Sequence, residues 1–188
     1  MITTWRKKWG YDFPFYISQI APYKYGDDNN DGAVVRDQQR KVLASTDKTA
    51  IIVTSDIGNV EDIHPRNKLD VGKRLANIAL KYDYQKKNGI VESPLLSKTV
   101  LAENVLTLHF TQSQNGLISK GDIDFFEVAS VDKVFRTVKP KVVGSTIVLD
   151  VSKITKPRYV RFAMGNTSSP YLFNAEGLPV SCFEEEIK

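Results

Sequence analysis

The sequence predicts an α/β part followed by a small all-β sandwich, with the boundary near residue 88. Up to that point, apolar strand-like runs alternate with amphipathic helix-like stretches. After Asn88-Gly89, short alternating segments are separated by turn signals, and no helical stretch lies between them. The 188 residues, of which 41% are hydrophobic, are enough for a packed core in each part. We therefore expect two domains, residues 1–88 and residues 89–188.

The first part has the order strand, helix, strand, helix. Residues 14–20 form a compact apolar and aromatic run, which is typical of a buried strand. Residues 49–54 are β-branched and apolar on both faces, as in a parallel strand that is covered on both sides. Helix-forming residues with spaced apolar positions occupy residues 34–45 and, most clearly, residues 68–84. This order predicts part of a parallel sheet with helices against it.

The second part consists of short predicted strands. Residues 105–110 alternate in polarity, which places Leu106, Leu108 and Phe110 on one face. Asn115-Gly116 and Val143-Gly144 are among the turn signals that separate the segments. The other predicted strands are residues 123–129, 146–151 and 159–164.

The composition excludes several classes of function. The chain carries 26 basic and 22 acidic residues, a net charge of +4, and no concentrated basic stripe, so we expect no nucleic-acid binding. A single cysteine, Cys182, excludes an intrachain disulfide and a cysteine-based zinc site. Apolar runs such as residues 50–53 are far too short to span a bilayer, so no membrane span is expected.

Aromatic residues gather near the N-terminus, around the first predicted strand. They could form a stacking platform for a sugar ring, but their position favours packing in the core. The residues concerned are Trp5, Trp9, Phe13, Phe15 and Tyr16.

His64 is the residue on which the functional prediction depends. It lies in the loop that leaves the second predicted strand, and in open α/β sheets such loops carry the active site. Glu61 and Asp62 precede it, and an acid so placed can hold the imidazole as a general base. A second interpretation stays open, in which this is a capping loop with acids near the next helix N-terminus. The other histidine, His109, lies in an alternating strand and is expected to have no functional role.

Residues 27–32, Asp-Asp-Asn-Asn-Asp-Gly, match the first six positions of an EF-hand calcium loop. The twelfth position is Gln38 instead of the bidentate glutamate, and Pro22 and Gly26 prevent a long helix before the loop. We therefore favour a solvated turn here and expect no metal or other cofactor.

The stretch Asp-Ile-His-Pro-Arg-Asn-Lys-Leu-Asp-Val-Gly-Lys-Arg-Leu-Ala, residues 62–76, is the most specific motif in the chain. Together with Gln-Ile-Ala-Pro-Tyr at residues 19–23 and Asn-Ala-Glu-Gly-Leu-Pro at residues 174–179, it resembles the C-terminal part of the sialate O-acetylesterases, members of the SGNH/GDSL hydrolase superfamily. The resemblance extends over nearly the whole chain. It implies part of a three-layer SGNH-type parallel-sheet domain, followed by the family's β-domain.

The resemblance also implies roles for individual residues. His64 would activate a serine that attacks an O-acetyl ester on a sugar or sialic acid. Asp62 is the aligned acid, whereas Glu61 occupies the position, three residues before the histidine, that the wider superfamily often uses. Arg36 and Gln39 would bind the substrate, although exposed polar residues at a helix start are an equally good interpretation.

The nucleophile that this chemistry needs is not found. The family's Gly-Gln-Ser-Asn block does not occur, and Ser18, Ser55 and Ser145 lack the glycine turn that presents a catalytic serine. Residues 2–9 look like the middle of a helix without an N-cap. We therefore expect a C-terminal fragment of a longer esterase that is inactive alone and self-associates through an exposed sheet edge.

Two alternatives to this function stay open. The first is a non-catalytic carbohydrate-binding or scaffolding module in which the sandwich is the working part. The second is an independent hydrolase with another nucleophile or a metal. The resemblance suggests a periplasmic, extracellular or lysosome-like compartment, because the substrates are extracellular glycans.

Overall fold

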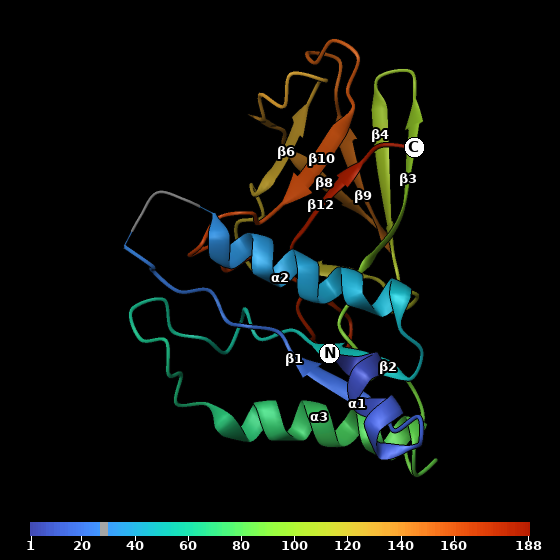
Figure 1. Ribbon diagram of the computed structural model, residues 1–188. Coiled ribbons are helices and arrows are strands. Elements are labelled where there is room, and N and C mark those ends of the chain that lie inside the picture. The colour runs from blue at the N-terminus through green and yellow to red at the C-terminus, as the bar shows by residue number, and fades with distance from the viewer. Residues whose placement is uncertain (27–29) are drawn as a thin grey trace.

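The computed structural model describes residues 1–26 and 30–188 (Figure 1). Its first part contains short strands flanked by helices. The elements are α1 (Ile2–Trp9), β1 (Phe15–Ser18), α2 (Asp31–Lys41), the 3₁₀-helix η1 (Val42–Ser45), β2 (Thr49–Ile52) and α3 (Lys68–Tyr82).

Strands β1 and β2 pair in parallel, with Phe15 opposite Thr49, in agreement with the expected strand–helix order. In Figure 1, α2 lies on one side of this pair and α3 on the other. The fully buried Ile78 of α3 packs in one cluster with Ala50 and Ile52 of β2. Burial of this apolar face holds α3 against the sheet.

The start of α3 is fixed by a local cap. The Asn67 side chain accepts a hydrogen bond from the backbone N–H of Asp70 at 3.1 Å, which satisfies one of the free donors of the first turn. The helix ends at Tyr82, two residues before the predicted end. The histidine loop therefore leads into a helix whose first turn is capped.

The second part is built of antiparallel strands. One sheet has the order β3-β4-β9-β8, a second the order β12-β10-β6-β7, and β11 pairs with β5. The strands are β3 (Leu96–Ala102), β4 (Val105–Phe110), β5 (Leu117–Ser119), β6 (Phe126–Ala129), β7 (Arg136–Thr137), β8 (Pro140–Val143), β9 (Thr146–Asp150), β10 (Tyr159–Phe162), β11 (Leu172–Asn174) and β12 (Phe183–Glu186).

The two larger sheets share one hydrophobic core. It joins Leu106 and Leu108 of β4 to Phe126 of β6, Phe162 of β10 and Phe183 of β12. The Phe126 and Phe162 rings stack with their centroids 4.3 Å apart. Apolar faces that meet in this way are compatible with a β-sandwich.

Most predicted elements are present with shifted ends. Strand β4 occupies the predicted residues, and Leu106, Leu108 and Phe110 are buried as expected. His109 is half-buried in the same strand. Helix α2 begins three residues earlier than predicted and ends at Lys41, where a 3₁₀ turn continues to Ser45. The boundary near residue 88 stays a prediction.

The prediction that the N-terminal tryptophans pack in the core is wrong. Trp5 is 48% exposed and Trp9 is 64% exposed, although their rings contact Phe15 and Phe13. Both tryptophans lie on α1, of which only Ile2 and Arg6 are buried. The aromatic cluster is thus half-open to solvent.

Within residues 1–26 and 30–188, no helix has both the length and the apolar character needed to cross a bilayer.

Candidate active site

A cavity of about 260 Å³ lies where β1 and β2 end. Its walls are the chain segments that follow the two strands, together with the first turn of α3. Apolar side chains dominate its surface, and a few polar groups reach it. Gln19, Pro22 and Tyr23 belong to one wall, and Ile57, Asp62 and Ile63 to the other. This is the place where ligands bind in open parallel sheets, outside the carboxyl ends of the strands.

The loop that carries His64 is tied to α3 by an ion pair, although His64 itself does not line the cavity. Arg74 donates two hydrogen bonds to the Asp56 carboxylate, at 2.7 and 2.6 Å, and a third to the Val53 carbonyl at 2.6 Å. Both charged side chains are less than one-fifth exposed, so water screens their attraction only in part. Arg74 thus fixes the position of Asp56, where the loop begins.

Gly58 brings the two walls together. Its φ is not in the left-handed region, so the backbone conformation does not require glycine here. Instead, a Cβ at this position would lie 2.7 Å from the Cβ of Ala21, on the opposite wall. Glycine is needed for the close approach of two backbone segments.

The structure places His64 beside Asp62. The imidazole Nδ1 lies 3.8 Å from Asp62 Oδ1, which is ion-pair distance but longer than a hydrogen bond. The same oxygen accepts a hydrogen bond from the His64 backbone N–H at 2.9 Å. The imidazole is 88% exposed, whereas Asp62 reaches into the cavity wall.

Glu61 is exposed, and its backbone N–H donates to the Asn59 side chain. Within residues 1–26 and 30–188, no hydrogen bond or ion pair joins Glu61 to His64. Of the two acids, Asp62 is therefore the one whose side chain lies beside the His64 imidazole. The catalytic roles of His64, Asp62 and Glu61 stay predictions.

The serines near the cavity differ in their surroundings. Ser18 lies at the exposed end of β1 and lines the cavity. Ser55 is buried, and its hydroxyl is the one buried side-chain polar atom of the described residues that has no hydrogen-bond partner. Ser145 lies between β8 and β9, in the turn of the second part. None of them sits at the strand-to-helix turn typical of an esterase nucleophile.

Arg36 and Gln39, the predicted substrate-binding residues, contact other parts of the protein. Arg36 is 1% exposed, and its guanidinium donates to the carbonyls of Gly165 at 2.7 Å and Asn166 at 3.3 Å. Gln39 is half-buried, and its side-chain oxygen accepts from the Ile20 backbone N–H at 3.0 Å. Their contact with a sugar stays a prediction.

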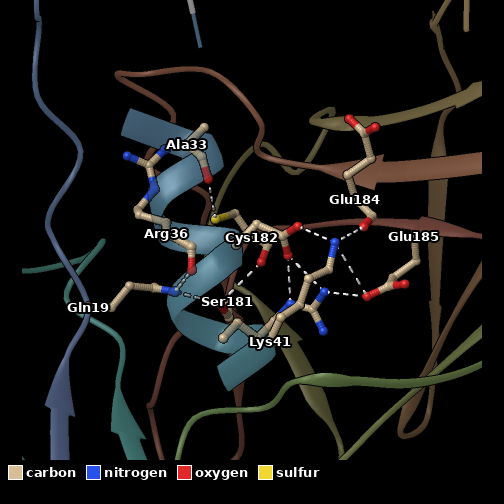
Figure 2. Close-up of polar contacts among 10 residues, drawn as sticks. Gln19, Ala33, Arg36, Lys41, Ser181, Cys182, Glu184 and Glu185 are labelled. Atoms are coloured by element: carbon tan, nitrogen blue, oxygen red, sulfur yellow. Dashed lines mark hydrogen bonds and ion pairs between the residues drawn. The ribbon is translucent and has the colours of Figure 1, made fainter. Parts of the chain in front are cut away.

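Helix α2 joins the two parts of the chain through a network of charges that is buried at Asp37 and Arg40 (Figure 2). Asp37 forms ion pairs with Arg40 at 2.8 Å and with Lys41 at 2.6 Å, and Arg40 reaches Glu185 of β12 at 2.5 Å. Burial alone lowers the pKa of Arg40, but the attraction of Asp37 and the hydrogen bond with Glu185 raise it on balance. The cation is therefore retained at this contact.

Two further kinds of reactive group, a thiol and a metal-binding cluster, form no site among the described residues. Burial raises the pKa of the Cys182 thiol, so it stays protonated at neutral pH and is a poor nucleophile. Among the described residues, no cluster of His, Cys, Asp or Glu side chains could hold a metal ion. The first half of the calcium-loop match, residues 27–29, lies outside the described residues.

Sequence reasoning missed most of the cavity wall. Gln19, Pro22 and Tyr23 belong to a segment that supported the family resemblance but was not assigned to the site. Asn166 and Ser181, which hold this wall from the second part, carried no local signal because they are more than 100 residues away in the chain.

Comparison with known proteins gives one informative result. No protein-family model matches the chain, and no curated protein matches it either. Among solved structures, the chain is similar to XAC1771, described as a novel carbohydrate acetylesterase from Xanthomonas citri, with a TM-score of 0.87 and 31% identity. The match covers 98% of this chain and 44% of that protein, so the chain spans less than half of its length.

This likeness supports the expected resemblance to a carbohydrate esterase. It extends over both the parallel-strand part and the β-rich part. It does not address sialic acid, the SGNH superfamily or the individual site residues.

Proposed function

We propose that this chain is the C-terminal part of a carbohydrate O-acetylesterase, to which it contributes the catalytic base His64. The observation that carries the proposal is the similarity, over 98% of the chain, to a carbohydrate acetylesterase. The geometry agrees with it, because the His64–Asp62 pair lies on the loop that lines a cavity at the carboxyl ends of two parallel strands.

The reaction would proceed through an acyl-enzyme. The His64 imidazole takes the proton of a serine hydroxyl as the serine oxygen attacks the acetyl carbonyl. The tetrahedral intermediate then breaks its bond to the sugar oxygen, which takes that proton from the imidazolium and leaves as an alcohol. Water repeats the sequence on the acetyl-serine and releases acetate. Asp62 would orient the ring and stabilise the imidazolium.

The serine and the oxyanion donors would come from a segment upstream of residues 1–188. Helices on both sides of the parallel pair support the assignment of residues 1–88 to half of a three-layer SGNH-type domain (Figure 1). Among the described residues, β1 pairs with β2 alone, which leaves its second edge free for a further strand. The exposed rings of Trp5 and Trp9 are surfaces that such a segment would cover. Residues 89–188 would form the trailing β-sandwich.

We further propose 9-O-acetylated sialic acid, or a similar acetylated glycan, as the substrate. This rests on the resemblance of residues 62–76 and 174–179 to the sialate O-acetylesterases.

The test compares the chain alone with the chain extended by the reading frame upstream of Met1. We expect the chain alone to hydrolyse 4-nitrophenyl acetate no faster than buffer, and the extended protein to release acetate from acetylated sugars. In the extended protein, His64→Ala should lower kcat by about 10²–10⁴-fold, whereas His109→Ala serves as the matched control and should leave it unchanged. Activity of the chain alone that His64→Ala abolishes would show that the nucleophile lies within these residues.

The acid partner is identified by a second pair of variants in the extended protein. If Asp62 orients the imidazole, Asp62→Asn should lower kcat strongly and Glu61→Gln should have little effect. The reverse order would assign the role to Glu61.

A further inference from the structure

We propose that the β-rich part holds one wall of the candidate active site, residues 19–23, in place, and that Gln19 is the positioning residue through which Ser181 fixes this wall. The inference rests on the proposed function, because it concerns the cavity that we assign to the acetyl ester. It concerns how the cavity is held in place and does not add a catalytic group.

Gln19 connects four parts of the structure. Its side chain is buried, at 2% exposure, and its amide nitrogen donates to the Arg36 carbonyl of α2 at 2.9 Å and to the Ser181 hydroxyl at 3.0 Å (Figure 2). Its backbone N–H donates to the Ile52 carbonyl of β2 at 3.0 Å. Its own carbonyl accepts from the Thr54 hydroxyl at 2.7 Å.

The rest of this wall is held by further contacts with the same neighbours. The Ile20 N–H donates to the side chain of Gln39 on α2. The Tyr23 N–H donates to the Asn166 carbonyl at 3.0 Å, and the Asn166 side-chain oxygen accepts from the Gly32 N–H at 2.9 Å. Residues 19–23 thus have their position fixed at both ends by residues of the β-rich part.

The same wall sets the position of the histidine loop. The Lys24 N–H donates to the Val60 carbonyl at 2.9 Å, just before Asp62. Thr54, at the start of that loop, donates to Gln19. Hydrogen bonds are directional, so these contacts define where the loop lies, which burial of apolar surface alone does not. Loss of the Gln19 donor should therefore loosen both walls of the cavity.

The test is amide hydrogen exchange of the chain as it exists, with no need for enzymatic activity. Gln19→Glu keeps the shape of the side chain but replaces the donor by a carboxylate that faces a carbonyl. We expect the amides of residues 19–21, 23 and 24 to lose about tenfold or more of their protection at pH 7, while the β4 and β9 amides keep theirs. Gln38→Glu, the same change at an exposed position of α2, is the matched control and should leave all protection factors unchanged.

A pH series distinguishes positioning from space filling. A protonated glutamate can donate a hydrogen bond, and burial favours that neutral form. The lost protection in Gln19→Glu should therefore return as the pH falls, relative to the wild type at each pH. Ser181→Ala is the second variant, in case Gln19→Glu does not fold, and should loosen the same amides less strongly, because the Arg36 carbonyl still accepts.

Unchanged protection of residues 19–24 in either folded variant would overturn the proposal, as would an equal loss in β4 and β9. Because exchange is measured without substrate, these outcomes are separate from those of the esterase assays.

Discussion

Replacement of Arg36 by methionine tests whether its guanidinium stabilises the fold or binds a substrate. The side chain is 1% exposed and donates to the Gly165 and Asn166 carbonyls, in the loop that follows β10. Methionine keeps most of the apolar stem and its flexibility but removes both donors. The Asn166 carbonyl would keep its hydrogen bond from Tyr23, whereas the Gly165 carbonyl would lose the shorter of the two contacts.

The expected loss follows from these two contacts. A hydrogen bond from a charged group contributes roughly 1.5–3 kcal/mol. The loss at Asn166 is smaller, since that oxygen keeps a partner, and removal of a buried charge returns part of its desolvation cost. We expect Arg36→Met to lower the free energy of unfolding by about 2 kcal/mol. For a chain of this length, that lowers Tm by roughly 4–8 °C.

Urea unfolding followed by circular dichroism measures the difference, with Arg136→Met on the exposed β7 as the matched control. The control should stay within about 0.5 kcal/mol of the wild type. If Arg36→Met is equally stable, the guanidinium does not hold the loop, and the prediction that Arg36 binds the sugar gains support. A stability loss without a change in substrate affinity of the extended protein would count against sugar binding.

Three further perturbations follow from single contacts. Gly58→Ala should lower the free energy of unfolding, measured by urea titration, by about 1–3 kcal/mol, because the added methyl group meets Ala21 on the opposite wall. Gly72→Ala is the matched control on α3, where the methyl group has open space, and it should raise the free energy of unfolding by about 0.5–1 kcal/mol. Ser55→Ala should leave thermal stability unchanged or raise it, because an unpaired buried hydroxyl is removed; a fall of Tm would show that the hydroxyl has a partner. Burial, followed by the hydrogen bond to Asp83, raises the pKa of Tyr16. The tyrosine of the unfolded chain therefore loses its proton at a lower pH than that of the folded chain, and the free energy of unfolding should fall as the pH rises above about 10. Tyr16→Phe should reduce that fall, which urea titrations between about pH 9 and 12 measure.

The sequence predicts those elements whose own residues carry the pattern of burial. Strand β4 alternates because one face meets the core, and α3 carries an apolar stripe for the same reason. Strand β3 has a single buried residue, Thr99, so its sequence has no alternation to detect. In β12 one phenylalanine precedes three glutamates, and the strand is held by pairing with β10 and by cations on α2. Both strands depend on partners that are distant in sequence.

The candidate site divides in the same way. The loop with His64 and Asp62 is continuous in sequence, so its position after a buried strand could be predicted. The surroundings of Arg36 could not, because they depend on where α2 begins and on which face meets the second part. With the start at Asp31, Arg36 points to the loop after β10 instead of to solvent. Residue type and local spacing do not contain that information.

The contact between the two parts is mostly polar, and this has a consequence for the whole molecule. Among the described residues, buried apolar side chains form two separate clusters, one at β2 and α3 and one in the β-rich part, and Ala33 is the α2 residue that joins the second. The rest of α2 reaches the β-rich part through charges and hydrogen bonds, which require defined partners at defined distances. An apolar interface tolerates sliding, whereas this one permits few arrangements. The cavity wall at residues 19–23 needs that constraint, because its contacts with the β-rich part are the hydrogen bonds of Gln19 with Ser181 and of Tyr23 with Asn166.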